Sequence, residues 1–345
     1  MRRGRWTTPA NHSVDPEVSV GDLGEAALID RIRERVPESP AWVRIGIGDD
    51  AAVLEPARGA LEVVTTDTLV EGIHFDRAFC TYSDLGYKVL AVNLSDLAAM
   101  GATPSWFLLN LVMPDADETW LEEFSTGLCS LAEEFGVELI GGDTARGPLC
   151  LSATVGGHVK SGTALMRNGA QAGDQLWVSG TLGDAAIGLD LVDGVPGAND
   201  HDMDYLVGRL NRPKPRIDLG LSLSAVATAC IDISDGLLAD LGHILRESGA
   251  LGAIVDVSCL PLSPQAIAVC GESLARQKAL AGGDDYEICF TASPARRPQI
   301  EQLTDQCNVK LTCIGSVQAP PGIALTGTDH QDLAGIKPGY RHDWA

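Results

Sequence analysis

The order of apolar and polar positions along the chain predicts two successive mixtures of strands and helices. In the first half, apolar residues at helical spacing predict a helix over residues 22–36. β-Branched and aliphatic runs over 43–54 and 61–70 predict strands that end in acidic loops. We expect Ser83 to cap a helix that runs to about Met100. The remaining predicted elements of this half are a helix over 118–135 and strands over 104–113, 137–140 and 149–159.

The pattern restarts after residues 161–173, a segment of glycines and polar residues that we interpret as a hinge between two domains. Residues 193–204 are predicted to form a variable loop, and helices are expected on either side of 212–216. The other predicted elements are strands over 175–179, 229–233, 251–257, 286–292 and 310–317, and helices over 184–191, 236–247, about 263–279 and 296–304. The predicted fold class is therefore α/β and α+β, with a loose tail at 1–18, an N-terminal domain at 19–160 and a C-terminal domain at 161–345.

Length, composition and charge narrow the class of protein. A chain of 345 residues is too long for one ordinary core, and a hydrophobic content of 45% is typical of a globular protein. No apolar run is long enough to cross a membrane, and the N-terminus lacks the apolar stretch of a secretory signal, so we expect a cytoplasmic protein. The formal charge of -22 argues against binding nucleic acid through its phosphate backbone.

Two features of the composition limit the candidate chemistry further. The nine cysteines are scattered, and no CxxC pair suggests zinc or redox work, so we expect reduced core residues. A solvated acidic surface would account for aspartates and glutamates on exposed faces. It does not account for aspartates beside glycines inside apolar, strand-like segments.

Four short segments combine aspartate with glycine, namely residues 48–50, 141–144, 231–236 and 282–285. Two carboxylates about 4 Å apart repel by roughly 4 kcal/mol at a surface-like dielectric, so a cluster of them needs cations to stay ionised. Mg²⁺ is the expected cation because it takes hard oxygen ligands and shares them with substrate phosphates. Glycines let the backbone approach an anion closely. Together the segments predict one metal-phosphate site, although each alone is also good turn chemistry.

Within 231–236, strand alternation places Asp232 and Ser234 on one face, and Gly236 then opens a helix. Phosphates are commonly bound at such a strand-to-helix turn. For Asp235, a role as a helix N-cap is the competing explanation.

Asn93 and Asp96 are three residues apart and share one face of an otherwise apolar helix. A carboxylate there should be paired or metal-bound, whereas a lone aspartate is more often a polar residue at the helix surface.

The end of strand 61–70 and the following loop bring hydroxyls, carboxylates and an imidazole together, as residues 65–68 lead to His74. Hydroxyls and carboxylates suit octahedral Mg²⁺. A turn stabilised by side-chain hydrogen bonds explains the segment equally well, and a single histidine is more often structural than a ligand.

Five basic residues lie near the acidic loops or the proposed hinge, and any of them could contact a nucleotide phosphate: Arg146, Arg167, Arg212, Lys214 and Arg216. For residues 212–216, a proline-stiffened helix start with solvated charges is equally consistent. The chain has no Walker A sequence, no kinase catalytic loop and no Rossmann fingerprint after a strand, which disfavours the usual nucleotide folds.

The chain resembles the thiamine-monophosphate kinases, a family of the superfamily that includes aminoimidazole ribonucleotide synthetase and selenophosphate synthetase. The matching segments, in the family's order, are residues 46–54, 65–75, 91–102, 140–147, 231–237 and 282–287, and the resemblance covers roughly residues 20–343. It implies a two-domain, aminoimidazole ribonucleotide synthetase-like fold whose N-terminal strands pair across a homodimer. It also implies transfer of the ATP γ-phosphoryl group to thiamine monophosphate, assisted by several Mg²⁺ ions, in thiamine diphosphate biosynthesis.

The resemblance further implies roles for individual residues. The Mg²⁺ ligands would be Asp50, Thr65, Thr66, Asp67, Asp96, Asp143, Asp232 and Asp235. The ATP contacts would be Gly142, Asp143, Arg167 and Ser234, and the contacts to thiamine monophosphate would be His74, Asp284 and Tyr340. No covalent nucleophile or general base is implied, because a phosphate monoester with a second pKa of about 6 is largely ionised at neutral pH.

The chain departs from the family pattern at two places. Asp284 stands where the family usually has glutamate, so its carboxylate is one methylene shorter. The aromatic motif around Tyr340 is also altered, so Tyr340 or Trp344 could serve as the platform for a cationic thiazolium ring.

Two other functions compete with this hypothesis. One is an enzyme of the same superfamily with a different acceptor. Selenophosphate synthetase is disfavoured because it normally carries a reactive cysteine or selenocysteine near its N-terminus, ahead of the first acidic segment, whereas the first cysteine of this chain is Cys80. The other is a non-catalytic, acidic metal-binding protein, which the presence of all the required aspartates disfavours.

Overall fold

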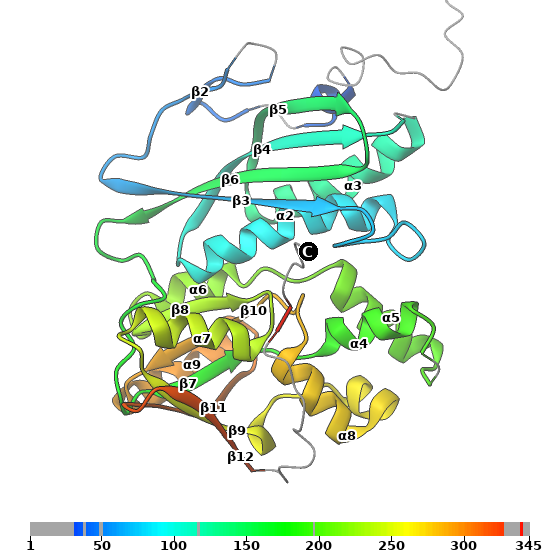
Figure 1. Cartoon of the computed structure of the whole chain (residues 1–345). Coiled ribbons are helices and arrows are strands. Elements are labelled where there is room, and N and C mark those ends of the chain that lie inside the picture. Colours follow the sequence, from blue (N-terminus) through cyan, green and yellow to red (C-terminus); the bar gives the residue numbers. More distant parts are fainter. Residues whose placement is uncertain are drawn as a thin grey trace, which may run out of the picture.

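A computed structural model describes residues 31–36, 39–47, 51–115, 118–195, 197–327 and 339–340 (Figure 1). The predictions for residues 22–30, Asp50 and Trp344 fall outside these ranges, and residues 31–35 are helical as predicted. No helix in the described part of the chain is both long and apolar enough to cross a membrane.

The N-terminal half is a four-stranded sheet in the order β3-β6-β4-β5, with helices α2 and α3 on one face (Figure 1). Its elements are β3 (Ala60–Val70), α2 (Tyr82–Ala99), β4 (Thr103–Met113), α3 (Glu118–Phe135), β5 (Glu138–Arg146) and β6 (Cys150–Lys160). On β4, Phe107, Leu109 and Leu111 are buried in the core, whereas the alternate residue Asn110 is exposed. One face of the sheet is therefore covered by helices. On the other face, Val64 and Thr66 of β3 are exposed, whereas Leu108 of β4 lines a cavity together with Ile47 and Leu54.

The C-terminal half is a six-stranded sheet in the order β12-β9-β11-β7-β10-β8, in which only the β12–β9 pair is parallel. Its strands are β7 (Gln175–Ser179), β8 (Ala229–Ile233), β9 (Gly252–Asp256), β10 (Glu287–Ala292), β11 (Leu311–Gln318) and β12 (Gly322–Thr326). Its helices are α4 (Asp184–Val192), α5 (Asp200–Asn211), α6 (Ile217–Leu223), α7 (Leu237–Glu247), α8 (Pro264–Ala281) and α9 (Arg297–Gln306), with short 3₁₀ turns at Val257–Cys259 and Pro294–Arg296. Strands β8 and β10 are buried along their whole length.

Helix α2 lies between the two halves (Figure 1). Most of its residues are buried, because one side packs on β3 and β6 and the other side packs on α6 and β8. Strands β8 and β10 are antiparallel neighbours, with Glu287 opposite Ile233, so the loops after β8 and before β10 emerge at one edge. Two polar residues of α2 reach this edge: Ser95 donates a hydrogen bond to Asp232, and Lys88 donates one to Asp284.

Most predicted elements are present, and four predictions about local structure were wrong. Residues 43–54 form two short antiparallel strands, β1 (Val43–Ile45) and β2 (Val53–Leu54), instead of one strand. Helix α2 is capped by Thr81, whose hydroxyl and Asp84 form a capping box, and not by Ser83.

Strand β5 continues through residues 141–146, which were expected to form a loop, because parallel pairing with β4 satisfies their backbone groups. Helix α5 begins inside the predicted loop 193–204, where Asn199 caps it and Asp200 and Asp202 stabilise its N-terminus. Strand β12 was not predicted. The helices on either side of residues 212–216 are confirmed, and the domain boundary after residue 160 stays a prediction.

Candidate functional site

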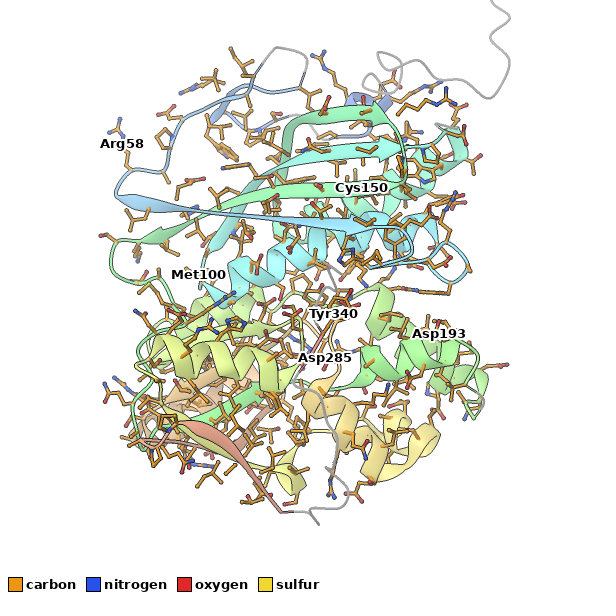
Figure 2. The ribbon with its side chains drawn as sticks, in the orientation of Figure 1. Arg58, Met100, Cys150, Asp193, Asp285 and Tyr340 are labelled. Atoms are coloured by element: carbon orange, nitrogen blue, oxygen red, sulfur yellow. The ribbon has the colours of Figure 1, made fainter. Side chains whose placement is uncertain are left out.

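A cavity of about 560 Å³ lies between the two halves. It is lined by residues of β3, α2 and the loops that flank β8 and β10. The predicted site residues that line it are Thr65, Asp67, His74, Asp96, Arg167, Asp232, Ser234, Asp235, Asp284 and Tyr340. Figure 2 shows Tyr340 between helix α2 and the C-terminal strands.

Three carboxylates from three elements meet here, on β3, α2 and β8. Strand alternation turns Thr65 and Asp67 toward α2, and the Thr65 hydroxyl donates a 2.5 Å hydrogen bond to Asp96 Oδ2. From the neighbouring position on α2, Ser95 Oγ donates a 2.7 Å hydrogen bond to Asp232 Oδ2. Helix α2 therefore fixes the carboxylates of both halves.

The described residues do not balance the charge of these carboxylates. Burial raises the pKa of Asp67 to about 6, and the nearby Asp96 adds to the effect. Burial also raises the pKa of Asp96, although the Thr65 hydrogen bond and Arg167 oppose it. The pKa of Asp232 is raised well above its ordinary value, by burial first and by Asp96 second. A cation bound among them would favour their ionised forms.

The donor set at this point fits Mg²⁺, because it consists of carboxylate and hydroxyl oxygens. Within the described ranges, no three His, Cys, Asp or Glu side chains are arranged to hold a metal ion by themselves. Mg²⁺ is commonly bound by one or two carboxylates together with water and substrate phosphates, which is compatible with this arrangement.

A second cavity of about 500 Å³ adjoins the first and shares part of its wall. The residues that line both cavities are Thr65, Asp96, Arg167 and Asp232. The carboxylates of Asp96 and Asp232 therefore stand where two cavities meet.

The strand-to-helix turn after β8 is held by Asp240, a residue that the sequence did not indicate. Its Oδ2 accepts hydrogen bonds of 3.1 Å from the backbone N–H groups of Ser234, Asp235 and Gly236. Burial, with Asp235 second, raises the pKa of Asp240 to about 7. Because these N–H groups already have a partner, Ser234 can offer a phosphate only its hydroxyl. Gly236, and not Asp235, is the N-cap of α7.

The residues expected at the acceptor lie at the other end of the first cavity. His74 Nδ1 accepts a 3.0 Å hydrogen bond from the backbone N–H of Val70, so the neutral ring carries its proton on Nε2. Asp284 Oδ2 lies 3.1 Å from the ammonium of Lys88, which is almost completely buried. The backbone N–H of Tyr340 donates to Asp235 O at 2.9 Å, and 48% of the residue is exposed.

Some predicted site residues lie elsewhere. The side chain of Thr66 points to the other face of the sheet, where its hydroxyl donates to Ala153 O at 3.0 Å. Asp50 is outside the described residues. Their roles as metal ligands stay predictions.

Gly142 and Asp143 line a separate cavity of about 910 Å³ beside β4 and β5. A Cβ atom on Gly142 would clash with the backbone of Leu109 on β4, so close strand packing by itself requires glycine at this position. Asp143 is exposed, and it pairs in register with Asn110. Within one chain, Gly142 and Asp143 do not line the two cavities that meet at Asp96 and Asp232. The ATP and metal contacts predicted for them therefore stay predictions.

Of the five basic residues considered, only Arg167 lines the shared cavities. Arg212 lies 2.5 Å from Asp84 and over the ring of Tyr87, and Arg216 pairs with Glu287 at 2.5 Å. Residues 212–216 therefore lead into helix α6 with two arginines in ion pairs, where solvated charges were the alternative considered, while Lys214 is exposed.

Comparison with known proteins gives three consistent results. Residues 48–161 match the family model of AIR synthase related proteins, N-terminal domain. The chain is 46% identical to the thiamine-monophosphate kinase of Salmonella typhimurium, over 86% of this chain and 91% of that protein, and 34% identical to that of Bacillus subtilis, over 87% and 94%.

Solved structures agree. The thiamine-monophosphate kinase of Stenotrophomonas maltophilia K279a has a TM-score of 0.81 and 48% identity, over 87% of this chain and 96% of that chain. A structure of AaThiL complexed with AMPPCP and TMP has a TM-score of 0.71 and 32% identity, over 89% and 94%.

Proposed function

This chain belongs to the thiamine-monophosphate kinase family, and we propose that it transfers the γ-phosphoryl group of ATP to thiamine monophosphate, giving thiamine diphosphate and ADP. The observation that carries the proposal is the junction of two cavities at Thr65, Asp96, Arg167 and Asp232. Direct transfer requires two polyanions to meet in line at one point, and two adjoining cavities with a shared wall provide such a point.

The acceptor would occupy the end of the first cavity that His74, Asp284 and Tyr340 line. The exposed ring of Tyr340 can lie against a cationic thiazolium through a cation-π contact. Arg167 and Ser234 would contact the phosphates of ATP. The acceptor phosphate is largely ionised at neutral pH because its second pKa is about 6, so the protein needs no general base.

Asp67, Asp96, Asp232 and the Thr65 hydroxyl would hold several Mg²⁺ ions, each taking one or two of these carboxylates together with water and substrate phosphates. When bound, Mg²⁺ offsets the negative charge of the phosphates and aligns their oxygens. The protein's own contribution is to orient the carboxylates, through the Thr65 and Ser95 hydrogen bonds. By family resemblance, Asp50, Thr66, Asp143 and Asp235 would supply further ligands.

We also propose that two copies pair through their N-terminal strands and that the protein works in the cytoplasm. On the sheet face away from α2, Val64 of the edge strand β3 is 55% exposed. Pairing there would cover apolar surface that a monomer leaves in water.

The test is a comparison of acceptors with purified protein, ATP and Mg²⁺. We expect thiamine diphosphate from thiamine monophosphate and none from free thiamine. Absence of product from thiamine monophosphate would contradict the proposal, and product from free thiamine would instead indicate a pyrophosphokinase. Asp143→Asn should abolish turnover and leave the fold intact, as checked by thermal denaturation; an unchanged rate would remove Asp143 from the metal site.

A further inference from the structure

Lys88 is a buried lysine on α2 to which the proposed chemistry gives no role. Its side chain is 2% exposed, and its ammonium lies 3.1 Å from Asp284 Oδ2 and 3.5 Å from the carbonyl oxygen of His74. Lysine is almost never fully buried unless it is paired. Lys88 therefore contacts both of the loops that carry the acceptor residues His74 and Asp284.

The position of Lys88 on α2 fixes its distance from Asp96, where the two cavities meet. Lys88, Val92 and Asp96 follow one another at intervals of four residues, so they form one stripe along the helix. Val92 and Asp96 both line the first cavity. Eight residues of α-helix span about 12 Å, so Lys88 and Asp96 are held at a fixed separation along one rigid element.

The Asp284 loop has a backbone conformation that needs support. Asp284 and Tyr286 have φ angles of +66° and +49°, in the left-handed region that non-glycine residues rarely adopt. Their backbone N–H groups donate to Ser234 O and Ile233 O, each at 2.8 Å. The Tyr286 hydroxyl also donates to Asp284 Oδ1 at 3.3 Å, so each oxygen of the Asp284 carboxylate has a partner.

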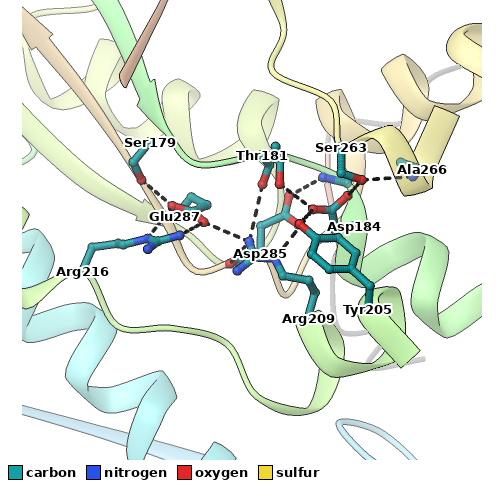
Figure 3. Close-up of polar contacts among 11 residues, drawn as sticks. Ser179, Thr181, Asp184, Tyr205, Arg209, Arg216, Ser263, Ala266, Asp285 and Glu287 are labelled. Carbon is teal, nitrogen blue, oxygen red and sulfur yellow. Dashed lines mark hydrogen bonds and ion pairs between the residues drawn. The ribbon is translucent and has the colours of Figure 1, made fainter. Parts of the chain in front are cut away.

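A buried polar network holds the other side of this loop (Figure 3). Glu287 accepts hydrogen bonds from Arg209, Arg216 and Ser179, at 2.9, 2.5 and 2.5 Å. Asp285 Oδ2 accepts a 2.7 Å hydrogen bond from the backbone N–H of Gly183. Asp285 and Glu287 thus anchor the loop in the C-terminal half, while Asp284 and Tyr286 line the cavity. On the cavity side, Lys88 ties the loop to α2.

We propose that Lys88 is a positioning residue for the acceptor. Its ammonium holds the Asp284 carboxylate and the His74 loop at a set distance from Asp96, so that the acceptor phosphate reaches the point where the two cavities meet. This role rests on the proposed function of the cavity. It predicts that loss of Lys88 weakens acceptor binding and alignment, while the nucleotide contacts at Arg167 and Ser234 stay intact.

The test is Lys88→Met, which keeps an unbranched side chain and removes the charge. The KM for thiamine monophosphate should rise by about tenfold or more, because a charge-assisted hydrogen bond is lost. The Kd for the ATP analogue AMPPCP, measured by calorimetry with Mg²⁺, should change by less than about twofold, since an intact site leaves its affinity unaltered. Lys88→Arg, which keeps the charge, should recover much of the acceptor KM.

A matched control is Lys278→Met on α8, which removes another partly buried ion pair, the 2.6 Å contact to Asp190, outside the cavity. This variant should leave both constants unchanged. If Lys88→Met does not fold, Lys88→Gln, which keeps a hydrogen-bond donor and removes the charge, takes its place and should raise the acceptor KM.

Equal losses of nucleotide and acceptor binding, or a lower melting temperature with an unchanged acceptor KM, would overturn the positioning role and leave Lys88 as a structural residue. A wild-type protein that neither binds nor phosphorylates thiamine monophosphate would overturn the proposed function, and this role with it. The wild-type measurement therefore separates the two failures.

Discussion

At the scale of residues, the site joins carboxylates that are far apart in the sequence. Asp67, Asp96 and Asp232 lie on three elements, and each has a pKa raised mainly by burial. Among the described residues, the cations near them are few: Arg167 acts on Asp96, and Lys88 is engaged by Asp284. Such a group of carboxylates is suited to ligands that bring their own positive charge.

The pKa of Asp67 leads to a prediction about pH. Its folded value of about 6 exceeds the ordinary value of 3.8, so the ionised carboxylate opposes folding when no cation is bound. Its stabilising contribution is present below about pH 4 and is lost as the pH rises through about 6. Mg²⁺ needs the ionised form, so its affinity should fall as the pH falls below about 6.

Thermal denaturation with and without Mg²⁺ checks this. The increase in Tm caused by Mg²⁺ should be larger at pH 7.5 than at pH 5.5, and Asp67→Asn should reduce the difference. Equal Mg²⁺ effects at the two pH values in the wild-type protein would show that Asp67 does not bind the ion.

The sequence indicated these residues to different degrees. Alternation along β8 correctly placed Asp232 and Ser234 on one face, and helical spacing placed Asp96 on the polar face of α2. Lys88 was missed because its partner Asp284 is 196 positions away, so no local pattern joins them. A lysine eight residues before Asp96 in an apolar helix was the available signal.

At the scale of elements, α2 can lie against α3 only because glycines face each other across the helix contact. A Cβ atom on Gly127 of α3 would clash with the Ser83 carbonyl, and one on Gly86 of α2 would clash with the Phe124 carbonyl. Helix α2 also carries Lys88 and Asp96, so its close contact with α3 fixes the position of both residues relative to the first cavity.

Gly127→Ala should therefore destabilise the protein, by about 1–3 kcal/mol or more, because the backbones must move apart. The matched control is Gly208→Ala in α5, where an added Cβ meets nothing within 4 Å. That substitution should be neutral or stabilising by up to about 1 kcal/mol. Urea denaturation measures both, and similar free energies of unfolding for the two variants would refute the packing argument.

Helices and strands with clear periodicity were predictable, whereas elements fixed by distant partners were not. Strand β5 continues through two glycines because β4 pairs with it in register and satisfies its backbone groups. Residues 141–146 alone do not reveal this partner. Helix α5 begins within a segment whose composition is typical of a loop, because a cap at Asn199 and an acidic first turn start it. Local propensity was overridden by tertiary pairing in the first case, and capping outweighed composition in the second.

At the scale of the whole molecule, the first cavity depends on the two halves of the chain that meet at α2. The N-terminal half supplies Asp67 and Asp96, and the C-terminal half supplies Asp232 and Asp284. Gly142 and Asp143 lie beside the open region of the N-terminal sheet instead. The resemblance correctly indicated the family, but the placement of these two residues relative to the first cavity requires a three-dimensional structure.

Pairing of two chains through the N-terminal strands is tested by sedimentation equilibrium. The protein should have about twice the chain mass of 36.3 kDa, because an exposed apolar surface favours association. A monomer at micromolar concentration would contradict pairing.

The central claim is tested most directly by ³¹P NMR of ATP, Mg²⁺ and thiamine monophosphate with the purified enzyme. We predict equal amounts of thiamine diphosphate and ADP, because only the γ-phosphoryl group moves. Asp232→Asn should slow the reaction by about 100-fold or more, the effect of removing one electrostatic partner of a transition state. Appearance of AMP, or no thiamine diphosphate from the wild-type protein, would contradict the account.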